Sequence, residues 1–310
     1  MPEPNPPRPA IAVLVPCHNE ALTVAEVVRG FRAALPGAVI YVYDNNSTDG
    51  TADAARAAGA EVRAETRPGK GSVVRRMFAD IEADWYVMVD GDATYDASAA
   101  RRLVDHAIAH RLDMVNVARE ETGQKAYRRG HRFGNRMLTG LVGRVFGQQT
   151  NDMLSGYKVF SRRFVKSFPA MSAGFEIETE LMIHALELKL PVGEISAPYG
   201  ERPEGSTSKL ATYRDGFVIL RLIGVLVQRE RPLEFFGAVA ALLLLAGLGL
   251  GLPVVLEFLS TGLVPRLPTA VLASGLVLSA LLALAVGLIL AAVTHSRREM
   301  KRLAYLAAGS

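Results

Sequence analysis

The stretch Trp85-Tyr86-Val87-Met88-Val89-Asp90-Gly91-Asp92 decides how this chain is interpreted. A continuous apolar run is typical of a strand buried in a sheet, and this one ends in two carboxylates separated by a glycine. Folding alone does not call for two acids at the exit of a core strand, because their charges repel each other. A divalent cation shared with a polyphosphate would relieve that repulsion, and oxygen ligands suit Mg²⁺ or Mn²⁺. The alternative is an acidic turn that caps the next helix, since a three-residue motif alone is weak evidence.

The same run belongs to a regular alternation of strand-like and helix-like segments. The apolar runs are Ile11–Val15, Val39–Tyr43, Trp85–Val89 and Met114–Val117, and the helical stretches are 20–35, 49–58, 71–83 and 97–111. This alternation predicts an α/β fold with a mostly parallel sheet and helices on both faces. Ligands of such sheets bind at the carboxyl ends of the strands. Polar clusters follow three of the predicted strands, at 17–20, 44–47 and 90–92.

The C-terminal part of the chain differs sharply in composition. Phe235–Leu256 carries no charged residue over 22 positions, and Leu267–Thr294 carries none over 28. Each run exceeds the roughly 20 residues that cross a bilayer as a helix, so residues 232–296 are predicted to form a hairpin of two transmembrane helices. Basic residues flank both outer ends of this hairpin, which places both termini and the soluble domain in the cytoplasm, at the inner membrane.

The rest of the composition bounds the function. Residues 1–9 are rich in proline and lack the apolar core of a signal peptide, so we expect a disordered leader there. The single cysteine, Cys17, excludes an intrachain disulfide framework and a cysteine-rich zinc site. The net charge of +4 has its excess near the predicted hairpin and in a basic cytoplasmic tail at 297–310, which favours a lipid bilayer over nucleic acid as the partner.

Seven motifs, taken in order, resemble those of family 2 glycosyltransferases. They are Val15-Pro16-Cys17-His18-Asn19-Glu20, Asp44-Asn45-Asn46-Ser47-Thr48-Asp49-Gly50-Thr51, Gly69-Lys70-Gly71, Asp90-Gly91-Asp92, Asn151-Asp152-Met153-Leu154-Ser155-Gly156-Tyr157, Phe175-Glu176-Ile177-Glu178-Thr179-Glu180, and Glu201-Arg202 to Lys209. With the hairpin added, the chain is similar to the polyprenyl-phosphate glycosyltransferases of the dolichol-phosphate mannose synthase-like group. His18 is a departure, because many members have tyrosine there.

The resemblance implies a GT-A fold for residues 10–206 and a specific reaction. One sugar would pass, with inversion, from a GDP- or UDP-linked nucleotide-sugar donor to a polyprenyl phosphate acceptor. The resemblance further implies that Asp90, Asp92 and Thr94 hold Mg²⁺ or Mn²⁺ with the donor diphosphate, with Asp92 the more direct ligand. Asp44 would recognise the nucleoside, since a carboxylate accepts hydrogen bonds from ribose hydroxyls or a base N–H. Pro16, Glu20, Lys70, Asp90 and Gly91 complete the implied nucleotide-sugar site.

Asp152 is the second predicted catalytic residue beside Asp92. In related enzymes an acid at this place lies near the anomeric carbon and serves as general base when the acceptor is an alcohol. A phosphate monoester has a second pKa of about 6 and is already an anion at neutral pH, so a base is barely needed. Asp152 could instead orient the sugar, complete the metal shell or cap a helix.

The acceptor side is predicted to lie at the membrane surface. Residues 127–146 form a basic amphipathic pattern typical of a helix in the membrane interface, and residues 207–231 form a second such segment leading into the hairpin. Packing against the sheet is the alternative for the first segment. Guanidinium groups bind phosphate oxygens bidentately. The predicted acceptor-phosphate residues are Arg128, Arg129, Arg132, Ser155, Arg202 and Lys209.

The sequence lacks the motifs that are expected for rival functions. A processive polysaccharide synthase of the same superfamily carries a Q-x-x-R-W motif, whereas the only tryptophan here, Trp85, follows Asp84. A sugar nucleotidyltransferase would have a glycine-rich phosphate loop and no hairpin. A catalytically inactive, nucleotide-sugar-binding membrane scaffold is disfavoured by the complete set of acids. We further expect homo-oligomers that form through the membrane helices.

Overall fold

The computed structural model describes residues 9–121, 140, 143, 152–174, 176–200, 228 and 230–309. The chain forms two compact units, Met1–Gly216 together with Lys301–Ser310, and Phe217–Met300. The predicted interfacial segments at 127–146 and 207–231 lie almost wholly outside the described residues. The predicted phosphate-binding residues Arg128, Arg129, Arg132, Arg202 and Lys209 lie outside them too.

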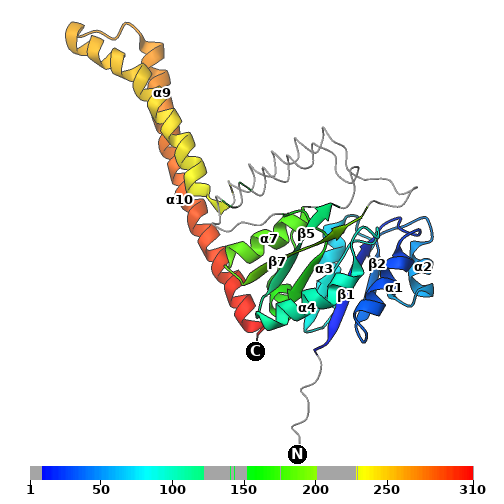
Figure 1. Cartoon of the computed structure of the whole chain (residues 1–310). Helices are drawn as coiled ribbons and strands as arrows, with labels where there is room; N and C mark the ends of the chain where they lie inside the picture. Colours follow the sequence, from blue (N-terminus) through cyan, green and yellow to red (C-terminus); the bar gives the residue numbers. More distant parts are fainter. Residues whose placement is uncertain are drawn as a thin grey trace, which may run out of the picture. The chain divides into compact units, whose positions relative to one another are not determined.

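Within the described residues of the first unit, seven strands form a single sheet in the order β3-β2-β1-β4-β6-β5-β7 (Figure 1). The strands are β1 Ile11–Cys17, β2 Val39–Asp44, β3 Glu61–Ala64, β4 Trp85–Met88, β5 Met114–Glu121, β6 Lys158–Ser161 and β7 Val192–Tyr199. Only β6 runs antiparallel to its neighbours, β4 and β5. The predicted mostly parallel α/β sheet is therefore confirmed.

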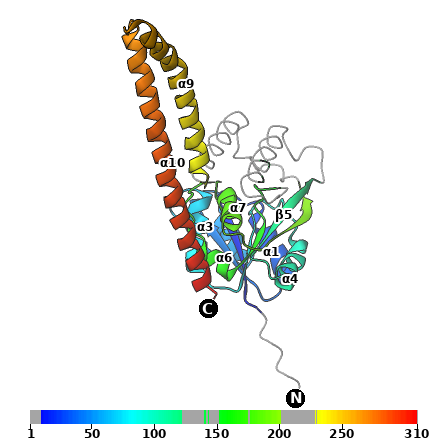
Figure 2. The ribbon, with the colours of Figure 1, turned by 90° about the vertical axis from the view of Figure 1, so that its left-hand side faces the viewer.

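Helices cover both faces of this sheet, as Figure 2 shows with α1 and α4 on one side and α3, α6 and α7 on the other. Their bounds are α1 Val24–Ala34, α2 Thr51–Ala57, α3 Lys70–Asp80, η1 Ala97–Ala99, α4 Ala100–Ala109, α6 Arg162–Ser167 and α7 Ile177–Glu187. In α1, Val24, Val27, Val28 and Phe31 are buried, and this i, i+3, i+4, i+7 spacing places them on one helical face. On the other face, the ring of Phe78 from α3 meets the ring of Phe160 from β6 edge-on.

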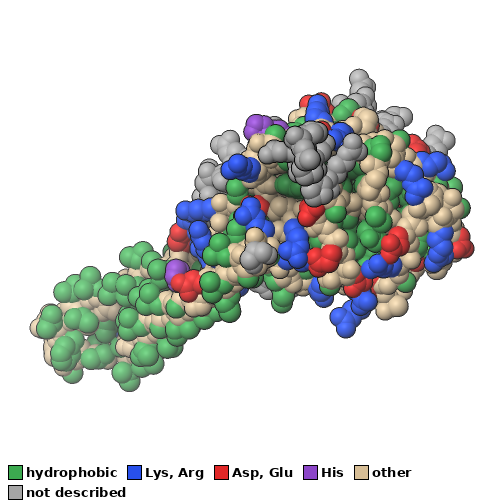
Figure 3. Space-filling model, turned by 90° about the horizontal axis from the view of Figure 1, so that it is seen from below, with side chains coloured by type: hydrophobic (Ala, Val, Ile, Leu, Met, Phe, Trp, Pro, Cys, Tyr) green, Lys and Arg blue, Asp and Glu red, His purple; other side chains and the backbone are tan. Residues whose placement is uncertain are grey.

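The second unit contains the helix α9 Pro232–Thr261 and most of the helix α10 Leu267–Ala307, whose residues from Lys301 onward belong to the first unit. Both are long and apolar enough to cross a membrane. The outer surface of the pair is covered by apolar side chains such as Leu242, Leu259 and Leu281, which are 60–75% exposed and would be stable only in an apolar surrounding (Figure 3). The predicted pair of long apolar helices is confirmed, and they could form a transmembrane hairpin.

Small residues line the contact between α9 and α10. The residues buried between the two helices recur every seven positions, at Ala240, Gly247 and Val254 in α9 and at Ala273, Ala280, Gly287 and Thr294 in α10. A seven-residue repeat keeps one seam of each helix facing its partner, and small side chains allow close backbone approach. A Cβ atom at Gly247 would lie only 2.9 Å from Val277 Cγ2. This packing was not among the predictions, although the repeat is visible in the sequence.

Candidate functional site

The loops that follow β1, β2 and β4 meet at the carboxyl edge of the sheet. Cys17 at the end of β1 pairs in register with Asp44 at the end of β2. The backbone N–H of Asn19 donates to Ser47 Oγ at 2.9 Å. Thr23 Oγ1 donates to the carbonyl oxygen of Gly91 at 2.7 Å. The structure therefore brings together the polar clusters that the sequence places after these three strands.

The D-G-D segment holds its second acid in a buried, fixed orientation. Asp92 is 3% exposed, and its Oδ1 accepts hydrogen bonds from the backbone N–H of Thr94 at 3.2 Å and from Thr94 Oγ1 at 2.6 Å. The turn between them has Ala93 in the left-handed region, at φ 57°. A non-glycine residue held at positive φ is strained, and such strain gathers at functional sites. Thr94 thus fixes the orientation of the Asp92 carboxylate through two hydrogen bonds.

The first acid of the segment, Asp90, is held by an internal cation. Lys70 Nζ lies 2.5 Å from Asp90 Oδ1 and 2.5 Å from Glu178 Oε1, and Lys70 and Glu178 are both buried. Burial alone would lower the pKa of Lys70, but the two carboxylates raise it overall, so the side chain remains an ammonium. The backbone of Gly156 closes the other side, since a Cβ atom there would lie 2.1 Å from Asp90 Oδ2. Asp90 is therefore held by Lys70 at Oδ1 and packs closely against Gly156 at Oδ2.

Glycine is also required between the two acids. A Cβ atom at Gly91 would lie 2.5 Å from Cys17 Sγ, and 3.7 Å from Cβ of Glu20. The D-G-D turn thus packs directly on the end of β1, with Glu20 beside it. The backbone N–H of Glu20 donates to Thr51 Oγ1 at 2.8 Å, which ties this loop to the start of α2. Pro16, one residue before Cys17, pairs with Tyr43 in the sheet register and is half-buried.

Asp44 carries a carboxylate oxygen whose bonding is incomplete. Its Oδ2 accepts a hydrogen bond from the backbone N–H of Ser47 at 3.2 Å. Its Oδ1 is buried, and no donor among the described residues reaches it. Buried polar atoms are almost always hydrogen-bonded, so an oxygen left in this state is a ready acceptor for a ligand hydroxyl or N–H.

Asn45 is a structural residue that the sequence interpretation passed over. Its Nδ2 donates to the carbonyl oxygens of Glu65 at 2.7 Å and Arg67 at 2.8 Å, and its Oδ1 accepts from the backbone N–H of Gly69 at 2.8 Å. One buried amide thereby holds the whole loop that carries Lys70. His18 Nδ1 lies 2.7 Å from the carbonyl oxygen of Asn45. His18, which departs from the family motif, therefore also contacts Asn45.

Asp152 is clamped by an arginine that was not predicted. Arg119, at the end of β5, places Nε 2.5 Å from Oδ2 and Nη2 2.8 Å from Oδ1 of Asp152, which is 5% exposed. Burial alone would raise the pKa of Asp152, but the hydrogen bonds and charge of Arg119 outweigh it and lower the pKa. A carboxylate held in this way is a weak base with a fixed orientation. A charged residue directly after the apolar part of β5 is the signal that could have identified Arg119.

Lys158 is a second buried cation beneath the site. It is fully buried at the start of β6, and its Nζ donates to Asn116 Oδ1. Asn116 Nδ2 in turn donates to the carbonyl oxygen of Asp152 at 2.8 Å and lies 3.1 Å from Glu194 Oε2. Burial lowers the pKa of Lys158 to about 8. A lysine at the head of the apolar run Lys158-Val159-Phe160 was the available signal.

The unfolding free energy should therefore rise between about pH 8 and 10.5, the folded and unfolded pKa values of Lys158. The unfolded chain binds the proton of the Lys158 ammonium group more tightly than the folded chain does. Stability is therefore gained as the pH rises through that window, and it is lost as the pH falls through the folded pKa. The full rise is on the order of 3 kcal/mol. We expect Lys158→Met to abolish it. Urea unfolding at several pH values, followed by the fluorescence of Trp85 in β4, measures the difference.

Lys189→Met provides the control, because Lys189 is an exposed lysine of the same unit. That variant should keep the wild-type dependence on pH. An unchanged rise in Lys158→Met would show that another group titrates.

Ser155, predicted to contact the acceptor, is fully buried in the turn before β6. Its Oγ accepts a hydrogen bond from the backbone N–H of Tyr157 at 3.2 Å. The next N–H, of Gly156, donates to the hydroxyl of Tyr95 at 2.8 Å. In the described part of the chain Ser155 thus shapes the turn that supports Asp90.

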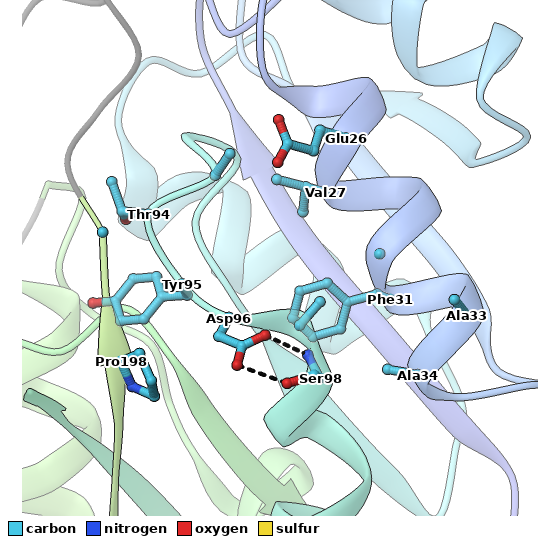
Figure 4. Close-up of a pocket in the computed structure, with 14 residues that line it drawn as sticks. Glu26, Val27, Phe31, Ala33, Ala34, Thr94, Tyr95, Asp96, Ser98 and Pro198 are labelled. Atoms are coloured by element: carbon cyan, nitrogen blue, oxygen red, sulfur yellow. Dashed lines mark hydrogen bonds between the residues drawn. The ribbon is translucent and has the colours of Figure 1, made fainter. Parts of the chain in front are cut away.

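A separate cavity of about 750 Å³ opens between α1 and the segment Ala93–Ser98. Figure 4 shows Phe31 and Val27 of α1 facing Tyr95 and Asp96 across it, and the Asp96 carboxylate bonds Ser98. Thr94 lies on its border. The acids Asp90, Asp92 and Asp152 are not among its lining residues.

The sequence matches the family described as Glycosyl transferase family 2 over residues 12–168. The chain belongs to this family. Glycosyltransferase AglJ of Haloferax volcanii is 34% identical over 259 residues, 83% of this chain and 84% of that protein. An uncharacterised protein of Shigella flexneri is 56% identical over 154 residues, 50% of this chain and 94% of that protein. As a family 2 glycosyltransferase, the protein transfers a sugar from a nucleotide sugar.

Solved structures confirm the GT-A fold of this family 2 glycosyltransferase. Glucosyl-3-phosphoglycerate synthase from Mycobacterium tuberculosis, in complex with Mn²⁺, UDP and glucosyl-3-phosphoglycerate, superposes with a TM-score of 0.57 at 23% identity. The match covers 72% of this chain and 80% of that one. Mannosyl-3-phosphoglycerate synthase from Rubrobacter xylanophilus gives a TM-score of 0.60 at 20% identity, over 72% of this chain and 75% of that one.

Proposed function

We propose that this protein transfers a single sugar from a UDP- or GDP-linked donor to a polyprenyl phosphate, with inversion at the anomeric carbon. One observation carries the proposal. A family 2 glycosyltransferase domain continues, in the same chain, into two helices long and apolar enough to cross a membrane. If these helices span a bilayer, the catalytic domain is held at the membrane surface. A polyprenyl phosphate, with a long apolar tail and a polar phosphate, is available there as an acceptor.

The residues at the strand ends fit a divalent cation that is shared with the donor. Asp90 and Asp92 offer hard carboxylate oxygens of the kind that Mg²⁺ and Mn²⁺ prefer. Among the described residues, no group of three or more His, Cys, Asp and Glu side chains could hold a metal on its own. The remaining ligands would come from the donor diphosphate and water, as is usual for Mg²⁺. When bound, the cation neutralises the charge that develops on the leaving diphosphate.

The side chains around the acids would position the donor and acceptor. Asp44 Oδ1 is buried and has no donor among the described residues, and a hydroxyl of the ribose or an N–H of the base would supply one. A phosphate oxygen of the acceptor attacks the anomeric carbon, and the carbon–oxygen bond to the diphosphate breaks on the opposite side. Because the phosphate is an anion above its second pKa of about 6, no proton has to be removed from it. Asp152, held by Arg119, then orients the sugar and does not act as an obligatory base.

The test is turnover of a panel of UDP- and GDP-sugars by the full-length protein in detergent, with a short polyprenyl phosphate as acceptor. We expect one donor to give a polyprenyl-phosphate sugar and the free nucleoside diphosphate. A product with several sugars, or transfer only to a polysaccharide or another lipid, would contradict the proposed acceptor. Donor binding without turnover under any of these conditions would indicate an inactive scaffold.

The proposal also fixes the topology. Arg231 precedes α9, and Arg297, Arg298, Lys301 and Arg302 lie in the last part of α10, so both ends of the hairpin should lie in the cytoplasm, where nucleotide sugars are made. A reporter fused after Ser310 should therefore be cytoplasmic. A reporter inserted near Thr261, at the end of α9, should lie on the opposite, non-cytoplasmic side of the membrane. Protease accessibility and reporter activity in whole cells distinguish the two sides. The reverse pattern would contradict a cytoplasmic donor.

A further inference from the structure

Glu178 lies outside the D-G-D segment and is connected to Asp90 through the side chain of Lys70. The Nζ atom of Lys70 lies 2.5 Å from one oxygen of Asp90 and 2.5 Å from one oxygen of Glu178. The side chains of Lys70 and Glu178 are 8% and 7% exposed, whereas that of Asp90 is 29% exposed. One of the two acids is thus neutralised by an internal cation, and that cation is itself held by a third carboxylate.

The G-K-G turn is shaped to bring Lys70 to this position. A Cβ atom at Gly69 would lie 2.2 Å from the carbonyl oxygen of Ala173, and one at Gly71 would lie 2.2 Å from that of Ser172. The backbone N–H of Gly71 also donates to the carbonyl oxygen of Ala173 at 2.9 Å. Glycine on both sides of Lys70 therefore allows the start of α3 to touch the segment that leads into α7.

Further contacts fasten that segment. Arg75 of α3 donates from Nε to the carbonyl oxygen of Ala170 at 2.7 Å. Glu180 of α7 accepts hydrogen bonds from the backbone N–H groups of Met171 at 3.0 Å and Ser172 at 2.8 Å. Backbone packing, and not the flexibility of two surface side chains, thus sets the position of the Lys70–Glu178 pair.

The charges suggest what the pair does. A buried ion pair is a poor way to join two elements, because desolvation of the two charges offsets much of their attraction. Here the elements are already joined by backbone hydrogen bonds. Burial raises the pKa of Glu178, and the ammonium group of Lys70 opposes that rise. With the three carboxylates ionised and Lys70 protonated, the group carries two more negative than positive charges, which matches a divalent cation. Removing Glu178 would leave too little negative charge, and removing Lys70 would leave an excess.

We propose that the Lys70–Glu178 ion pair sets the affinity of Asp90 and Asp92 for a divalent cation, with Lys70 lowering this affinity and Glu178 restoring it. The proposal rests on the metal binding in the proposed function. Since both side chains are shielded from solvent, salt screens their effect only weakly. They are therefore positioning residues whose charges act on the site at short range.

The test is the affinity of the full-length protein in detergent for Mn²⁺ alone, measured from the electron paramagnetic resonance signal of free Mn²⁺. We expect Glu178→Gln to weaken binding and Lys70→Met to strengthen it, each by about tenfold or more. The double variant should return close to the wild-type affinity. A pair that only stabilises the fold predicts a different result, in which both single variants weaken binding.

Failure of this inference can be told apart from failure of the proposed function. Wild-type protein that binds no Mn²⁺, or binds it as well after Asp92→Asn, would remove the metal site itself. Wild-type binding combined with single variants that shift the affinity in the same direction would overturn only the role of the ion pair. If Lys70→Met does not fold, Glu178→Gln compared with the double variant isolates the charge of Lys70. The double variant should then bind Mn²⁺ more tightly, and equal or weaker binding overturns the proposal.

Discussion

Replacing Asp92 with asparagine should reduce sugar transfer by about 10³-fold while leaving the fold intact. Asparagine keeps the shape of the side chain and an oxygen that accepts the bonds from Thr94, so the strained turn through Ala93 is preserved. What is lost is a negative charge at the strand end where the diphosphate leaves. Initial rates with the best donor of the panel measure the effect, and Trp85 fluorescence reports that the unit is folded.

Asp105→Asn is a matched control, because Asp105 pairs with Arg101 on the exposed surface of α4. A surface ion pair contributes little to stability, so that variant should transfer sugar at the wild-type rate. Wild-type transfer should also disappear in excess EDTA and return with Mg²⁺ or Mn²⁺. Undiminished activity in EDTA, or in Asp92→Asn, would contradict the metal assignment.

The sequence predicted the strands that begin with an apolar run. The four predicted strands are all present, and β4 begins at Trp85 as expected. The strands that were missed, β3, β6 and β7, lack this signal. β3 has the sequence Glu-Val-Arg-Ala and is partly exposed, β6 begins with a lysine, and in β7 Gly193 and Glu194 follow the first valine. Such strands depend on the neighbours that they pair with, and single-sequence patterns do not identify those neighbours.

The candidate site was predictable to the extent that it follows strand ends. Parallel strands that lie side by side present their exits together, so Asp44, Asp90 and Asp92 could be grouped from spacing alone. Contacts between distant segments could not be foreseen in this way. Lys70 was predicted as a donor-binding residue, whereas the structure places its ammonium between Asp90 and Glu178. A likeness between motifs indicates that a residue belongs to the site, but packing decides which atom it touches.

A large effect of a single added methyl group is expected at Gly156. The Cβ atom of an alanine there would lie 2.1 Å from Oδ2 and 2.6 Å from Cγ of Asp90, closer than atoms can approach. The Asp90 carboxylate cannot simply rotate away, because Lys70 holds its other oxygen at 2.5 Å. Either the carboxylate or the turn before β6 must move. Displacing a reacting group by about 1 Å costs on the order of 10²-fold in rate, so Gly156→Ala should lose at least that much transfer.

Gly200→Ala separates this effect from a general intolerance of the site to alanine. Gly200 directly follows β7 in the same unit, and among the described residues a Cβ atom there would meet only the carbonyl oxygen of Thr94, at an ordinary 3.7 Å. Gly200→Ala should therefore transfer sugar nearly as fast as the wild type, and both variants should unfold cooperatively by Trp85 fluorescence. Because the added methyl group acts on Asp90, Gly156→Ala should also bind Mn²⁺ more weakly than Gly200→Ala. A Gly156→Ala protein with wild-type turnover and Mn²⁺ affinity would show that the position of Asp90 is not critical.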